Sequence, residues 1–200
     1  MIRVIGAGPG DIKYLTVEAY EIIKSSKCIA AFGRISKLAE NIGASVIKVE
    51  NVADILKIIG KVENLDILAS GDPCFFGITE YLEKNNIKVD EVIPGLSSFQ
   101  YMMAKLNKSW EGAGFVSLHG READMLKKDL KGMSVILTDR HHTPRQISKM
   151  LYNMGISGKI YAGFNLSYPD EKIIVKNIGE DVENYSDLSV VVVENEMDKG

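Results

Sequence analysis

Short apolar runs rich in β-branched residues alternate with amphipathic patterns through the first half of the chain. The apolar runs predict strands at residues 2–7, 28–33, 45–49, 66–70 and 90–95. The segments between them predict helices at residues 17–25, 35–42, 51–62, 76–85 and 97–106. In the third of these helices the apolar positions form the wide stripe of a helix that packs on a sheet. The regular alternation of strands and helices predicts a mostly parallel sheet.

The alternation changes after about residue 108, where the segment "SWEGAG" indicates a linker or hinge. Beyond it the pattern predicts helices at 121–131 and 144–153 and strands at 115–120, 134–139, 159–164, 171–177 and 188–195. The last three strands have no helix between them, which predicts antiparallel pairing. The predicted fold class is therefore α/β, with two α/β lobes at 1–109 and 110–200. We expect a mostly parallel first sheet, a mixed second sheet and a ligand cleft between the lobes.

The composition is that of an ordinary soluble domain, with 46% apolar residues in a chain of 200. The longest apolar runs are far shorter than the roughly 18 residues that span a bilayer. The opening "MIRVIGAG" does not resemble a cleavable signal peptide. Cys28 and Cys74 lack metal-ligand spacing and are too few for a disulfide framework. We expect a cytoplasmic protein without a membrane partner.

The formal net charge of −3 argues against nucleic acid as a partner, because phosphate binding needs a basic face. Arginine is rare, yet Arg121, Arg140 and Arg145 fall within 25 residues of one another. Guanidinium groups suit the bidentate recognition of carboxylates. A small anionic molecule is therefore a possible partner, and isolated surface charges are the alternative.

Three predicted strands of the first half end in unusual turns, "GAGPGD", "SGDPCFFG" and "PGLSSFQ". Ligands collect at the carboxyl ends of parallel strands, so these turns are candidate binding loops. The first turn departs from a dinucleotide-binding loop, because its third glycine comes one position early and Pro9 has no N–H. A carboxylate at Asp11 would also repel a diphosphate. A tight turn without a ligand is the alternative.

Polar residues in these endings have two interpretations. Asp72 can accept hydrogen bonds from ribose hydroxyls or an ammonium group, whereas Ser97 and Ser98 stand at a predicted helix start. Helix capping is the alternative for all three residues. In the second half, "SLHGR" contains His119, and "ILTDRHHTPR" contains the adjacent His141 and His142. No cluster with ligand spacing accompanies these two histidines, so we expect no metal and solvated histidines on a loop.

The segments "VIGAGPGDIKYLTVEA", "ASGDPCFFG" and "VIPGLSSFQ" resemble, in order and spacing, three signatures of the tetrapyrrole (corrin and porphyrin) methylases. The later segments "SLHGR", "ILTD", "NLSYPDE" and "LSVVVVE" resemble one branch of that family. That branch methylates carbon 5 of precorrin-7, or of its cobalt form, in cobalamin biosynthesis. The position of Phe164 is often acidic in the branch, so this chain departs from the pattern there.

The resemblance implies S-adenosylmethionine as methyl donor, S-adenosylhomocysteine as product, and an anionic tetrapyrrole as substrate. The donor contacts that it implies are Pro9, Asp72, Phe75, Ser97, Ser98, Leu137, Ala162 and Gly163. A general base would remove a proton, with His119 as first candidate and Asp11 as second. Arg121 and Arg140 would pair with the acetate and propionate groups of the substrate.

The resemblance also implies a homodimer. Some relatives carry a fused domain that decarboxylates and methylates at carbon 15, and we expect that activity in a separate protein here. Within the family, the alternatives are another corrin methylase, a uroporphyrinogen methylase, a diphthine synthase or a ribosomal RNA methylase. Outside it, the alternative is a nucleotide-binding regulatory module. Binding of S-adenosylhomocysteine but not of NAD(H) would favour the methylase.

Overall fold

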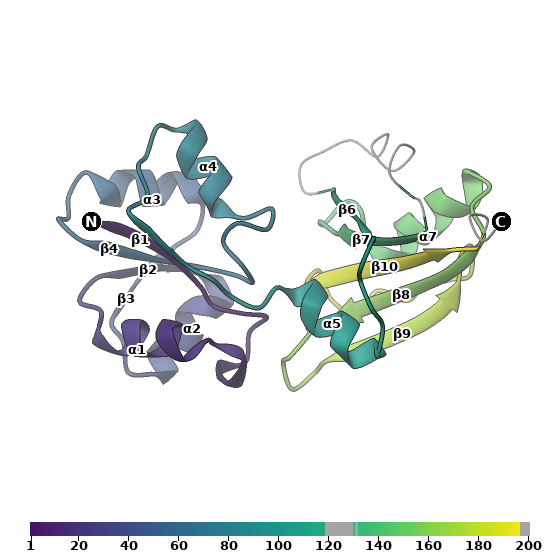
Figure 1. Ribbon diagram of the computed structural model, residues 1–200, viewed down its shortest axis with the longest axis horizontal. Helices are drawn as coiled ribbons and strands as arrows, with labels where there is room; N and C mark the ends of the chain where they lie inside the picture. Colours follow the sequence, from purple (N-terminus) through teal and green to yellow (C-terminus); the bar gives the residue numbers. More distant parts are fainter. Residues whose placement is uncertain (119–129, 131, 197–200) are drawn as a thin grey trace. The chain divides into compact units, whose positions relative to one another are not determined.

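The structure is a computed structural model that describes residues 1–118, 130 and 132–196 (Figure 1). The chain divides into two compact units, Met1–Tyr101 and Met102–Gly200. Each unit is an α/β lobe, as predicted, and each is described by itself. The predicted domain boundary after residue 109 and the predicted ligand cleft stay predictions.

The first unit contains a five-stranded sheet in the order β3-β2-β4-β1-β5. Its strands are β1 (Ile2–Gly6), β2 (Ile29–Phe32), β3 (Val46–Val49), β4 (Leu65–Ala69) and β5 (Glu91–Ile93). Its helices are η1 (Ile12–Tyr14), α1 (Val17–Ser25), α2 (Gly33–Asn41), α3 (Val52–Ile59), α4 (Ile78–Lys84) and the start of α5 (Ser98–Leu106). All neighbouring strands pair in parallel, which confirms the predicted parallel sheet.

Local signals explain where the first helices begin. Thr16 caps α1 by accepting a hydrogen bond from the Ala19 N–H, and Glu18 lies in the first turn, where a carboxylate favours the helix dipole. Asn51 and Asp54 form a reciprocal capping box at the start of α3. These contacts satisfy backbone donors that an uncapped helix leaves open.

Helices cover both faces of the first sheet (Figure 1). The alternate residues Ile5, Ile29 and Leu68 pack against Ala19 and Ile23 of α1 and against Ala39 of α2. The residues between them, Val4, Ala30 and Ile67, pack against Ile55 of α3 and Leu82 of α4. Burial on both faces explains why these strands read as continuous apolar runs.

The second unit contains a sheet in the order β6-β7-β10-β8-β9. Its strands are β6 (Gly114–Ser117), β7 (Met133–Leu137), β8 (Gly158–Phe164), β9 (Lys172–Asn177) and β10 (Ser189–Asn195). The pair β6 and β7 is parallel and the other pairs are antiparallel, so the sheet is mixed, as predicted. The last strand does not follow β9 at the edge but lies between β7 and β8. The predicted helix 121–131 falls almost entirely outside the described residues.

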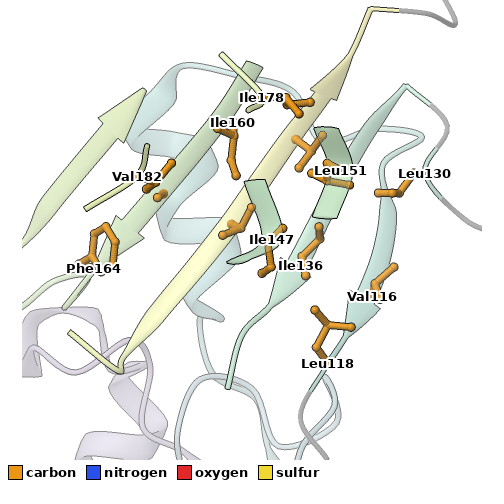
Figure 2. Packing of buried hydrophobic residues seen from close by; sticks show 13 residues of the cluster. Val116, Leu118, Leu130, Ile136, Ile147, Leu151, Ile160, Phe164, Ile178 and Val182 are labelled. Atoms are coloured by element: carbon orange, nitrogen blue, oxygen red, sulfur yellow. The ribbon is translucent and has the colours of Figure 1, made fainter. Parts of the chain in front are cut away.

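Helix α7 (Pro144–Asn153) covers one face of this second sheet. Thr143 and Gln146 form a capping box at its start, and Pro144 occupies its first turn. Figure 2 shows the apolar cluster that the helix and the sheet share, with Ile147 and Leu151 from α7 and Ile136, Ile160 and Phe164 from the strands. Phe164 is fully buried there, and its ring lies 5.5 Å from that of Tyr185. The residue that departs from the family branch is therefore a core residue.

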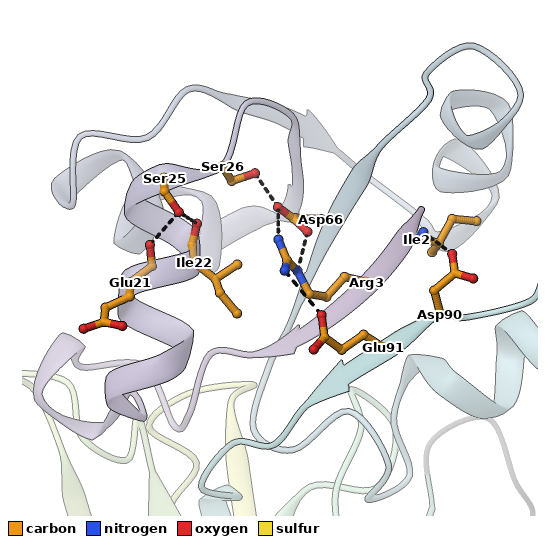
Figure 3. Close-up of polar contacts among 9 residues, drawn as sticks. All are labelled: Ile2, Arg3, Glu21, Ile22, Ser25, Ser26, Asp66, Asp90 and Glu91. Atoms are coloured by element: carbon orange, nitrogen blue, oxygen red, sulfur yellow. Dashed lines mark hydrogen bonds and ion pairs between the residues drawn. The ribbon is translucent and has the colours of Figure 1, made fainter.

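Charged side chains join the strands at the amino end of the first sheet (Figure 3). The Arg3 guanidinium donates to both carboxylate oxygens of Asp66, at 2.8 and 3.2 Å, and to Glu91 at 3.3 Å. The Ser26 hydroxyl donates to the same Asp66 carboxylate. The hydrogen bond that Arg3 donates to Asp66 is the main cause that raises the pKa of Arg3. The network connects β1, β4 and β5 at their amino ends.

Candidate functional site

Three loops meet at the carboxyl end of the first sheet. Gly8 and Gly71 pair through their backbones, with Gly71 N–H to Gly8 O at 2.9 Å and Gly8 N–H to Gly71 O at 3.3 Å. The loop after β5 lies against both, because a Cβ added to Gly95 would lie 2.2 Å from Gly71 O and 2.8 Å from Gly6 Cα. Glycine is the residue that permits such an approach of backbones. The unusual endings of β1, β4 and β5 thus form one cluster.

Asp11 is engaged within its own turn. Its carboxylate accepts a hydrogen bond from the Lys13 N–H at 3.0 Å and lies 3.1 Å from Lys13 Nζ. The backbone hydrogen bond is the main cause that lowers the pKa of Asp11. A carboxylate with a lowered pKa is a weaker proton acceptor, so its surroundings do not favour a role as general base. The neighbouring Pro9 is buried in the turn.

Asp72 connects the loops after β4 and β5. One carboxylate oxygen accepts from the Cys74 N–H at 2.8 Å, and the other accepts from the Gly95 N–H at 3.2 Å. Helix α4 begins only after Gly77, so Asp72 does not cap it. An ionised carboxylate offers about four acceptor positions. The two backbone donors hold the half-buried group in place and leave it capacity to accept from a hydroxyl or ammonium group.

Two aromatic residues follow Asp72 in the same loop, and one of them packs on Phe99 of α5. The Phe75 ring lies 4.6 Å from the Phe99 ring and 4.9 Å from the Phe76 ring, measured between centroids. Phe76 adopts a positive φ of 48°, and 40% of it is exposed. The exposed Phe76 ring, in the same loop as a fixed carboxylate, provides apolar surface for an organic molecule with both flat and polar parts.

Ser97 caps α5. Its hydroxyl donates to Gln100 Oε1 at 2.9 Å and accepts from the Gln100 N–H at 3.4 Å, and 3% of the residue is exposed. Ser97 therefore has the helix-capping role that its position in the sequence allows. Ser98 is the first residue of the helix and is half-buried.

The strands β6, β7 and β8 end at one edge of the second sheet, since β6 is parallel to β7 and both β7 and β8 are antiparallel to β10. Leu137 ends β7 and is half-buried. The Ala162 side chain belongs to the core beneath α7. Gly163 is packed closely, since a Cβ there would lie 2.9 Å from a Leu166 methyl carbon and 3.0 Å from Met102 Sδ.

The loop after β7 contains a carboxylate and imidazole pair that the sequence analysis missed. Asp139 Oδ1 accepts from the backbone N–H groups of His141 and His142, and it lies 3.0 Å from His142 Nδ1. His141 is exposed, as expected, whereas the His142 side chain is only 20% exposed and lies against Asp139. The signal available in the sequence was an aspartate three residues before a histidine in a strand-to-helix loop.

The remaining predicted site residues lie elsewhere. Arg140 is exposed in the loop after β7. His119 and Arg121 lie outside the described residues. Within residues 1–118, 130 and 132–196, no group of three His, Cys, Asp or Glu side chains could hold a metal ion. Over the same residues, no helix combines the length and apolar character needed to cross a bilayer.

Comparisons with known proteins give a consistent result. Residues 1–181 match the model of the Tetrapyrrole (Corrin/Porphyrin) Methylases. The chain is 32% identical to the probable cobalt-precorrin-7 C(5)-methyltransferase of Methanocaldococcus jannaschii, over 98% of this chain and 99% of that protein.

Solved structures show the same fold. A precorrin-6Y methylase from Archaeoglobus fulgidus, 24% identical, matches with a TM-score of 0.72 over 98% of each chain. The uroporphyrin-III C-methyl transferase from Thermus thermophilus, complexed with S-adenyl homocysteine, matches with a TM-score of 0.78 at 21% identity, over 96% of each chain.

Proposed function

Because the chain belongs to the tetrapyrrole (corrin/porphyrin) methylase family, we propose that it transfers a methyl group from S-adenosylmethionine to carbon 5 of cobalt-precorrin-7 in cobalamin biosynthesis. The observation that carries this proposal is the 32% identity to the relative from Methanocaldococcus jannaschii, which extends over nearly the whole of both chains. The segments "SLHGR" and "NLSYPDE" support the same branch of the family.

The residues at the carboxyl end of the first sheet fit the methyl donor. Asp72 is held by two backbone N–H groups and can accept from ribose hydroxyls or from the donor's ammonium group. Phe75 and Phe76 offer apolar surface to a flat base or to the sulfonium. The donor contacts proposed for the chain are Pro9, Asp72, Phe75, Ser97, Ser98, Leu137, Ala162 and Gly163.

The sulfonium of the donor supplies a methyl group that is already activated toward attack by carbon. The main task of the protein is then to hold the carbon and the methyl in line at about 3 to 3.5 Å, which can lower the barrier by several kcal/mol. Asp72 would fix the donor, and the exposed Arg140 would pair with a carboxylate of the substrate. Salt should weaken substrate binding, because an exposed ion pair is screened.

The test is a reaction of the purified chain with isotopically labelled S-adenosylmethionine and cobalt-precorrin-7. We expect mass spectrometry to find one labelled methyl group in the product. Calorimetry should also detect binding of S-adenosylhomocysteine and no binding of NAD(H). Methylation of another tetrapyrrole in place of this one would contradict the substrate, and binding of NAD(H) alone would favour a nucleotide-binding module.

A further inference from the structure

We propose that His142, oriented by Asp139, is the base that accepts the proton released when the substrate carbon is methylated. The inference deepens the proposed function and rests on it. His142 lies in the loop after β7, for which the sequence predicts solvated histidines.

The pair has the geometry of an oriented imidazole. Asp139 Oδ1 lies 3.0 Å from His142 Nδ1, and the two side chains are 10% and 20% exposed. Because an ionised carboxylate only accepts hydrogen bonds, Nδ1 carries the hydrogen and Nε2 presents its lone pair. Among the described residues, His142 Nε2 has no hydrogen-bond partner. The imidazole is therefore both held in one tautomer and able to accept a proton.

Asp139 is itself held in place by the loop. The backbone N–H groups of His141 and His142 donate to Oδ1 at 2.8 and 2.6 Å. The loop is further fixed at its far end, where Thr143 and Gln146 form the capping box of α7. A carboxylate that is fixed by backbone donors can hold an imidazole in one orientation, as in the aspartate and histidine pair of hydrolases.

The position of the pair suits the reaction. Leu137, a proposed donor contact, ends β7 two residues before Asp139. Two residues of chain span at most about 7 Å, so a methyl donor in contact with Leu137 would be within reach of the loop that carries the pair. His141, by contrast, is exposed and its side chain has no contact with Asp139 among the described residues.

A carbon–carbon double bond of the substrate gives its electron pair to the donor methyl, and the breaking S–CH3 bond returns its electrons to sulfur. The methylated carbon still carries its hydrogen, and the ring system is now short of one electron pair. His142 Nε2 takes that proton, and the C–H electrons restore the double bond. The products are the methylated tetrapyrrole, S-adenosylhomocysteine and a protonated imidazole.

The test compares His142→Ala with the neighbouring His141→Ala, using full-length protein, cobalt-precorrin-7 and S-adenosylmethionine. We expect His142→Ala to lower kcat by about 10² to 10⁴, the usual contribution of a positioned base, and His141→Ala to leave it unchanged. Added imidazole should restore part of the activity of His142→Ala, because the side chain it replaces is partly open to solvent. A residue that only caps the turn would not allow such rescue.

Asp139→Asn tests the positioning residue. We expect its kcat to fall while its affinity for S-adenosylhomocysteine stays that of the wild type. His142→Gln provides a second variant if His142→Ala does not fold, and thermal unfolding with S-adenosylhomocysteine titration reports the state of each.

Wild-type kcat in folded His142→Ala or His142→Gln would overturn the inference alone, as would loss of activity in His142→Ala that imidazole does not restore. Absence of any methylated product with the wild-type chain would overturn the proposed function instead.

Discussion

The two ends of the first sheet connect the same strands by different contacts. At the amino end, β1, β4 and β5 are joined by charged side chains, with Asp66 accepting from Arg3 and Ser26 (Figure 3). At the carboxyl end, the loops after the same strands are joined by backbone contacts among glycines and by the carboxylate of Asp72. The contrast indicates which charges are structural and which are available to a ligand.

The difference lies in how many acceptor positions each carboxylate has already filled. Asp66 is 7% exposed and receives three side-chain hydrogen bonds, so its role is to hold the strands. Asp72 is half-buried and receives two backbone hydrogen bonds. Substitutions of Asp66 and Asp72 should therefore separate stability from donor binding.

The largest effect is expected for Gly95→Ala at the carboxyl end. The added Cβ would lie 2.2 Å from Gly71 O, a backbone atom that cannot move without moving its loop. We expect the free energy of unfolding to fall by about 3 kcal/mol or more, as measured by urea denaturation. Gly60→Ala is the control, since Gly60 has φ −74° and no atom within 4 Å of its added Cβ. It should be neutral or stabilising by up to about 1 kcal/mol.

Asp66→Asn should have the next largest effect, at the amino end. It removes the charge that faces Arg3 and places an amide donor near other donors, which should lower the free energy of unfolding by about 2 to 3 kcal/mol. The affinity for S-adenosylhomocysteine, measured by calorimetry on folded protein, should stay unchanged. Lys84→Met, which breaks the exposed pair with Glu80, should cost less than about 0.5 kcal/mol. Loss of affinity in folded Asp66→Asn would contradict a purely structural role for Asp66.

Asp72→Asn should show the reverse pattern. We expect the affinity for S-adenosylhomocysteine to fall about 10-fold or more, since hydrogen bonds to a charged group are worth about 1.5 to 3 kcal/mol. The free energy of unfolding should fall by only about 1 kcal/mol, because one oxygen remains to accept from a backbone N–H. An unchanged affinity would remove Asp72 from the proposed donor site.

The smallest effect concerns Asp11 and acid. The pKa of Asp11 is lowered in the folded protein, mainly because its carboxylate accepts from the Lys13 N–H. The ionised carboxylate therefore stabilises the fold, and this contribution is complete above pH 3.8, the pKa of Asp11 in the unfolded chain. That contribution is lost as the pH falls through the folded pKa. Asp11→Asn should therefore make the free energy of unfolding depend less on pH. The loss between pH 5 and pH 2, measured by urea denaturation, should be smaller than in the wild type by less than about 1 kcal/mol. If Asp11 were the catalytic base, the same variant would instead lose kcat at neutral pH.

Much of the fold could be predicted because it is encoded locally. Helices α1 and α7 begin at capping residues, Thr16 and Thr143, that the sequence displays next to an apolar pattern. The order of the second sheet could not be predicted, because the apolar run of β10 is compatible with either an edge or a central position. Its place between β7 and β8 depends on pairing across the chain.

The candidate site was predictable only in part. The parallel sheet requires the endings of β1, β4 and β5 to meet, and Asp72 was recognisable as an acceptor. The hydrogen bonds of Ser97 to Gln100 and of Asp139 to His142 depend on side-chain orientation within a turn. The spacing of these residues makes both contacts possible, but only the structure shows that the side chains are oriented to make them.

The most direct test of the proposed activity is carbon-13 NMR of the product formed from cobalt-precorrin-7 and S-adenosylmethionine labelled at its methyl carbon. When carbon 5 of the substrate also carries carbon-13, methylation there predicts a single labelled methyl resonance that is split by one-bond coupling to that ring carbon. A labelled methyl attached to any other atom, or no transfer by the folded protein, would contradict the account.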